Sequence, residues 1–188
     1  MRWRLLIGND LEQSIISLYS TDLKAGYTIL QISKLLNKAY PYINKKLNEF
    51  IASGIITKQN VGKSYLCHLN LASSQAIILL SIAEIRKLEE KSTQEHELEA
   101  VLSELKLIRK EFGILCAYET AKEILLIGDP KLQNDIASKA PLLHSKKFRV
   151  ISQKDFSAKA IQVLLGFENY YNLAGEMQWK KDLRLQFF

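Results

Sequence analysis

Apolar positions recur with a helical period in the first third of the chain. Residues 29–37 and 41–53 each carry apolar side chains three or four positions apart, which predicts two helices separated by a three-residue break. Thr28 and Gln31 have the spacing of a capping box, Pro41 suits a first helical position, and Gly54 suits a helix end. The residues predicted to be buried are Leu30, Leu35 and Leu36 in the first helix, and Ile43, Leu47, Phe50 and Ile51 in the second.

Two β-like runs follow these helices, at residues 55–59 and 65–70, and a turn containing Gly62 joins them. The order of helix, tight turn, helix and β-hairpin resembles a winged helix-turn-helix. The resemblance implies that the second helix enters the major groove of DNA. We therefore expect a sequence-specific transcriptional regulator whose partner is double-stranded DNA.

The polar face of the second helix supplies the candidate DNA contacts. Lysine pairs with guanine or phosphate, asparagine pairs with adenine, and tyrosine reaches phosphate or a thymine methyl group. The candidates, including two lysines of the hairpin, are Tyr40, Tyr42, Asn44, Lys45, Lys46, Asn48, Lys58 and Lys63. Glu49 lies on the same face and would repel phosphate. The alternative interpretation is a winged helix that binds protein and leaves this face solvated.

The distribution of charge favours the DNA hypothesis. The chain carries a net charge of +6, and residues 1–71 hold nine basic against four acidic side chains. The remaining residues hold seventeen basic and sixteen acidic side chains. Almost all of the positive excess therefore lies on the predicted reading domain, as is typical of nucleic-acid binding proteins.

Composition predicts a folded, cytoplasmic protein that does not bind membranes. The 188 residues are 47% hydrophobic and 24% charged, and the longest apolar run, at residues 76–83, is too short to span a bilayer. Cys67 and Cys116 show no metal-ligand spacing. Cys67 and His68 alternate along a strand, so we expect one to be buried and the other exposed. We predict no metal site and no cofactor.

Two further helices, at about 74–90 and 93–111, are predicted to form a linker. The second carries a nearly heptad-spaced apolar seam. This seam consists of Leu98, Val101, Leu102, Leu105 and Ile108. It predicts a homodimer, although packing of the same seam within one chain is an equal alternative.

The last third of the chain has mixed α/β character. Strands are predicted at 113–118, 123–127 and 147–152, and helices at 131–139, at 157–165 and from 166 onward. The predicted fold class is α+β. It comprises an N-terminal winged helix at 1–71, a helical linker or dimerisation segment at 72–111, and a small α/β domain at 112–188.

Three segments of this last domain resemble the minimal nucleotidyltransferase family. They are residues 124–129 (ILLIGD), 149–156 (RVISQKDF) and 166–173 (GFENYYNL). The resemblance implies a Gly-Ser turn that cradles a triphosphate and two aspartates that hold metal ions. Ala117 and Tyr118 stand at the Gly-Ser position, and Ala121 and Glu123 stand at the aspartate positions.

The domain is therefore predicted to be a degenerate, catalytically silent relative, and the protein not to be an enzyme. Two alternatives stay open. One is a nucleotidyltransferase with a diverged active site, and the other is an antitoxin-like module that binds a protein partner.

Overall fold

The computed structural model describes residues 10–62 and 64–186, with side chains as far as residue 177. The fold is mixed α+β, as predicted, with one three-stranded and one four-stranded sheet. The chain divides into two compact units between residues 84 and 85, inside helix α4 (Ser74–Ser92). We call them the N-terminal unit and the C-terminal unit.

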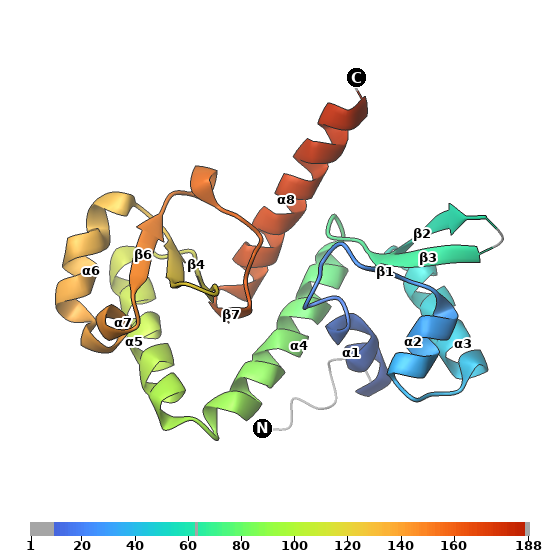
Figure 1. The fold of residues 1–188 in the computed structure, drawn as a ribbon, viewed down its shortest axis with the longest axis horizontal. Helices are drawn as coiled ribbons and strands as arrows, with labels where there is room; N and C mark the ends of the chain where they lie inside the picture. Colours follow the sequence, from blue (N-terminus) through green and yellow to red (C-terminus); the bar gives the residue numbers. More distant parts are fainter. Residues whose placement is uncertain (1–9, 63, 187–188) are drawn as a thin grey trace. The chain divides into compact units, whose positions relative to one another are not determined.

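The N-terminal unit combines helices α1 to α3 and the first part of α4 with a small antiparallel sheet (Figure 1). The strands lie in the order β1-β3-β2, and β2 pairs with β3 as a hairpin. The elements before α4 are α1 (Asp10–Ser17), β1 (Gly26–Tyr27), α2 (Ile29–Leu35), α3 (Tyr40–Ala52), β2 (Ile56–Val61) and β3 (Ser64–Leu69).

Local signals set the ends of α2 and α3. The Thr28 hydroxyl accepts a hydrogen bond from the Gln31 backbone N–H at 3.2 Å, and the Gln31 side chain accepts one from the Thr28 N–H at 2.8 Å. The predicted capping box is therefore confirmed. Pro41 lies in the first turn of α3, and Gly54 follows its end with a φ of 73° that favours glycine.

The buried face of α2 differs from the predicted one. Leu30 and Leu35 are 53% and 59% exposed, whereas Ile29 and Ile32 are buried. Leu36 is half-buried. The inward residues 29, 32 and 36 are three and four positions apart, as one face of a helix requires. The predicted set of residues 30, 35 and 36 lacks this spacing. In α3, Ile43, Leu47 and Phe50 are buried as predicted, and Ile51 is half-buried.

The C-terminal unit is built on a four-stranded sheet in the order β6-β5-β4-β7. β5 and β6 are parallel, and the other neighbouring strands are antiparallel. The elements after α4 are α5 (His96–Phe112), β4 (Cys116–Glu119), β5 (Ile124–Ile127), η2 (Pro130–Leu132), α6 (Gln133–Lys139), α7 (Pro141–Ser145), β6 (Phe148–Ile151), η3 (Gln153–Asp155), β7 (Gln162–Leu165) and α8 (Phe167–Gln186).

The apolar seam of α5 packs inside this unit. Leu98, Val101, Leu105 and Ile108 belong to one buried cluster with strand residues such as Leu126. Leu102 is partly buried and packs against the same cluster. Of the two alternatives for this seam, the structure shows packing within one chain. The predicted dimerisation face is therefore not available to a second copy.

The segment predicted as a helix at 157–165 instead ends in strand β7. Val163 and Leu164 are buried on opposite faces of the strand, and β7 pairs with β4. Gly166 follows with a φ of 67°, and a Cβ there would lie 2.2 Å from the Leu115 carbonyl oxygen. Residues that favour a helix in isolation are thus held extended by strand pairing, a tertiary effect that overrides local propensity.

The other face of the sheet carries an aromatic cluster. Tyr118, Phe156 and Tyr170 meet edge to face, with ring centroids 5.1–5.7 Å apart, and Tyr171 contacts Tyr170. Tyr170 and Tyr171 are both buried. Tyr118 lies in β4 and Tyr170 in the first turn of α8, so this cluster fixes the start of α8 on the sheet.

Candidate nucleic-acid interface

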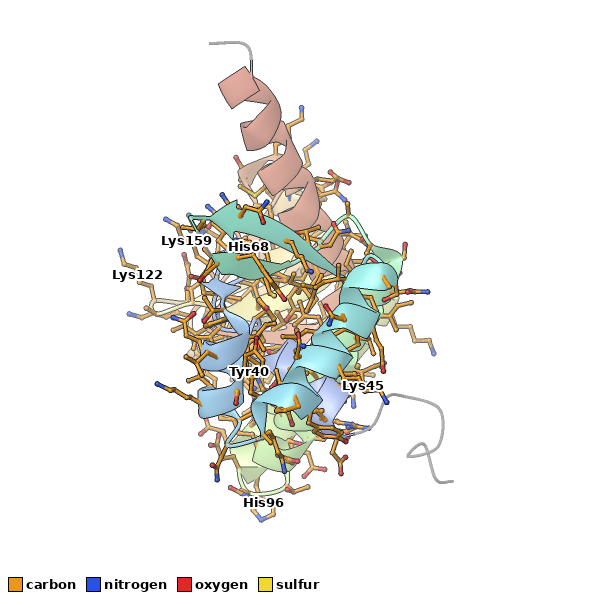
Figure 2. All side chains as sticks on the ribbon, turned by 90° about the vertical axis from the view of Figure 1, so that its right-hand side faces the viewer. Tyr40, Lys45, His68, His96, Lys122 and Lys159 are labelled. Carbon is orange, nitrogen blue, oxygen red and sulfur yellow. The ribbon has the colours of Figure 1, made fainter. Side chains whose placement is uncertain are left out.

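Helix α3 exposes a polar and aromatic face opposite its buried stripe. Lys45 and Asn48 are exposed, and Tyr42 is 51% exposed. Tyr40, the first residue of α3, is 46% exposed. Figure 2 shows Tyr40 and Lys45 on different sides of the helix. The face around Lys45 thus offers a cation, an amide and the Tyr42 phenol, which are all groups that contact DNA, and Tyr40 lies on another side of the helix.

Two asparagines lie on adjacent turns of this face. The Asn48 Nδ2 donates a hydrogen bond to the Asn44 Oδ1 at 3.3 Å, and Asn44 is half-buried. Each amide keeps an unused donor or acceptor beyond this bond. The bond thus links the two amides across one turn of the helix.

Lys46 has a different role from the predicted one. Its ammonium nitrogen lies 2.8 Å from a Glu12 carboxylate oxygen and 2.5 Å from one of Glu49. These two hydrogen bonds, with Glu12 first, raise the pKa of Lys46, and the Lys46 ammonium lowers the pKa of Glu49. Lys46 therefore ties α3 to α1 instead of projecting toward a ligand. It also neutralises Glu49, the discordant acid of this face.

The hairpin contributes one predicted cation. The Lys58 Nζ lies 4.4 Å above the ring centroid of Tyr65, in a cation–π contact. Lys58 opposes Cys67 in the pairing of β2 with β3, and Asn60 opposes Tyr65. The other predicted hairpin cation, Lys63, lies outside the described residues.

Tyr65 is a candidate that the sequence analysis missed. Burial is the main cause that raises the pKa of its phenol, and Cys67 and then Tyr40 raise it further. Tyr40 of α3 and Tyr65 of β3 are therefore electrostatic neighbours. The sequence could show that residues 65, 67 and 69 share one face of the strand. It could not show that Tyr65 lies beside Lys58, because that depends on the register between β2 and β3.

Neither cysteine is placed to act as a ligand or nucleophile. Cys67 is fully buried as one of the predicted pair, but His68 is half-buried and not exposed, and burial raises the pKa of the Cys67 thiol. The Tyr19 hydroxyl donates to the Cys67 carbonyl oxygen at 3.0 Å. Burial raises the pKa of the Cys116 thiol to about 12. Within the described residues, no group of three potential metal ligands comes together.

The nucleotidyltransferase-like positions of the C-terminal unit lie within β4 and in the turn that joins β4 to β5. Ala117 and Tyr118 are fully buried inside strand β4. Ala121 is exposed in the turn that follows. The Glu123 carboxylate bonds the Arg149 guanidinium at 2.6 Å. After β5, Asp129 accepts a hydrogen bond from the Lys131 N–H at 3.0 Å, so it caps η2.

Comparisons with known proteins give no relative. No protein-family model, curated protein or solved structure matches the chain. In the part of the chain that the structure describes, no helix is both long and apolar enough to cross a membrane. Function is therefore inferred from the geometry and charge of the chain itself.

Proposed function

We propose that the protein is a sequence-specific DNA-binding regulator whose N-terminal unit is a winged helix. The exposed face of α3 carries this proposal. In a helix-turn-helix the second helix enters the major groove, and here that helix presents Tyr42, Lys45 and Asn48 to solvent. The hairpin that follows supplies Lys58 beside the same helix.

The charge of this surface supports duplex DNA as the partner. The acid that would oppose phosphate, Glu49, is paired with Lys46. Lys45 shows no ion pair within the described residues. Lys45 therefore supplies positive charge to the face that would meet the groove, and Glu49, which shares the Lys46 ammonium with Glu12, is the acid on that face.

A selection from randomised duplexes, followed by fluorescence anisotropy on the recovered sequence, tests this proposal. We expect the observed association constant to fall with salt, with a slope of about −0.9 per phosphate contact on a log–log plot. Lys45→Ala and Asn48→Ala should each cost about 1–3 kcal/mol at a particular base pair. The exposed Lys122→Ala, in the C-terminal unit, is the control. Failure to bind any duplex at low salt contradicts the proposal.

We also propose that the C-terminal unit is a degenerate nucleotidyltransferase-like domain without catalytic activity. Metal-dependent nucleotidyl transfer needs carboxylates free to bind metal and a backbone cradle for phosphates. The Glu123 carboxylate is bonded to Arg149, and Ala117 and Tyr118 continue a buried strand where a cradle would need a turn. Magnesium-dependent binding or transfer of a nucleotide by the purified chain would contradict this.

A protein partner for the N-terminal unit is the second candidate. It is favoured by the two exposed leucines of α2, Leu30 and Leu35. Exchange of both for serine should leave DNA affinity unchanged. If the partner hypothesis holds, the same exchange abolishes co-purification of the partner.

A further inference from the structure

We propose that Lys58, Tyr65 and Tyr40 together bind one phosphate of the DNA backbone, at the junction of the hairpin with the start of α3. This inference rests on the proposed DNA binding. It adds Tyr65 to the interface and makes the three side chains one site instead of separate contacts.

Strand register places Lys58 and Tyr65 on one face of the hairpin. Side chains two positions apart on a strand share a face, and Lys58 is paired directly with Cys67 across the hairpin. Ile56 and Lys58 of β2 therefore lie on the same face as Cys67 and Tyr65 of β3. Ile56 and Cys67 are buried, and α3 packs against β2. Lys58 and Tyr65 therefore lie next to these buried residues, at the edge of the core on this face. Lys58 is exposed there, and Tyr65 is half-buried.

The contact with Tyr65 holds the Lys58 ammonium without neutralising it. An ammonium above a ring face, here at 4.4 Å, keeps N–H groups for an anion. Among the described residues no carboxylate pairs with Lys58, in contrast to Lys46, whose two acids use its charge. Lys58 is thus the positioned cation of the interface.

The two phenols complete the donor set. A tyrosine phenol carries its proton at neutral pH, and burial, followed by Cys67 and Tyr40, raises the pKa of Tyr65 further. Tyr40 is the first residue of α3 and is partly open to solvent. One cation with two neutral hydroxyl donors matches the single charge and the two free oxygens of a phosphodiester. A base edge offers no charge for the cation, so backbone phosphate is the better ligand.

The experiment compares the affinity and salt slope of single variants on a mixed-sequence duplex. Tyr65→Phe and Tyr40→Phe keep the rings and should each weaken binding about 3- to 10-fold without a change of slope, because a neutral donor releases no counterion. Lys58→Gln should weaken binding and reduce the magnitude of the slope by about 0.9 per bound chain. The combined Tyr40→Phe/Tyr65→Phe/Lys58→Gln variant should lose less than the product of the single losses, because the three share one ligand.

Two controls and two outcomes define the test. Thr57→Val removes a hydroxyl from the opposite face of β2, and Lys122→Gln removes a charge from the C-terminal unit; both should match the parent. Inorganic phosphate at constant ionic strength should not displace the duplex, which separates a backbone site from a site for free phosphate. If both Tyr→Phe variants bind like the parent, the three-residue site is wrong. If the parent itself does not bind DNA, the proposed function fails first.

Discussion

The side-chain amide of Gln133 hydrogen-bonds Val150 where the sheet of the C-terminal unit would otherwise continue to a fifth strand. The Gln133 Oε1 accepts from the Val150 backbone N–H at 2.7 Å, and its Nε2 donates to the Phe148 carbonyl oxygen at 3.3 Å. β6 is the last strand on this side of the sheet. The amide thus imitates a peptide group of a neighbouring strand and covers part of an exposed edge.

Gln133→Ala should therefore destabilise the C-terminal unit and open this edge. Loss of a partner for the partly buried backbone groups costs about 1–3 kcal/mol in the free energy of unfolding. Urea denaturation measures this loss, and size-exclusion chromatography at rising concentration measures self-association through β6. Gln153→Ala, at an exposed glutamine of η3, is the matched control. Equal stability of the two variants would show that the amide does not support β6.

The link between Lys46 and Glu49 predicts an unusual mutational pattern in DNA binding. Lys46→Ala should weaken binding, because it leaves the Glu49 carboxylate unneutralised on the helix that we propose to face DNA. Glu49→Ala should then restore most of the loss in the Lys46→Ala background. A direct contact between Lys46 and phosphate predicts no such restoration. Anisotropy on all four members of this double-mutant cycle distinguishes the two roles.

Two leucines of α5 provide a matched test of the packing of this helix. Leu105 is 1% exposed and Leu107 is 68% exposed, two positions apart. Leu105→Glu should unfold the C-terminal unit, because burial of an unpaired charge costs more than about 4 kcal/mol. Leu107→Glu should change the melting temperature little. If Leu105→Glu instead gives a folded protein that merely shifts from dimer to monomer by light scattering, the seam joins two chains.

Alkaline pH should destabilise the fold through its buried acids. Burial raises the pKa of the Cys116 thiol from 9.0 to about 12, and Arg109 opposes this only in part. Between these pH values the unfolded thiol loses its proton while the native thiol keeps it, so unfolding releases a proton. The free energy of unfolding then falls as pH rises, by up to about 1.4 kcal/mol per pH unit for this group.

Tyr19 and Tyr118 act in the same direction, because burial also raises the pKa of each phenol. Urea denaturation at several pH values above 9 measures the combined slope. Cys116→Ala removes one of these groups, so its slope should be shallower than that of the parent. Parallel slopes would show that the Cys116 thiol does not titrate differently in the folded and unfolded chain.

Sequence patterns located the N-terminal elements because their signals are local. The capping box of Thr28 and Gln31, Pro41 and Gly54 act within one or two turns of the helices that they delimit. Strand β7 lacks such a signal. Its extended form depends on pairing with β4, where Leu165 opposes Ala117 nearly fifty residues earlier.

The candidate interface divides in the same way. The exposed face of α3 follows from its helical period, so Lys45 and Asn48 could be placed from the sequence. The ion pair of Lys46 with Glu12 joins residues 34 positions apart, and the contact of Lys58 with Tyr65 depends on the hairpin register. Neither relationship has a trace in local spacing.

The ion pair of Glu123 with Arg149 has a consequence for protein engineering. A divalent cation that approached this end of β5 would have to displace a tethered guanidinium from the only acid present at the two aspartate-like positions. An aspartate introduced at position 121 would face the same competitor, since Arg149 is 60% exposed and has room to reorient. The order of substitutions therefore matters. Removal of Arg149 first leaves the Glu123 carboxylate without its partner and open to a cation. Addition of acids first only gives Arg149 further carboxylates to pair with.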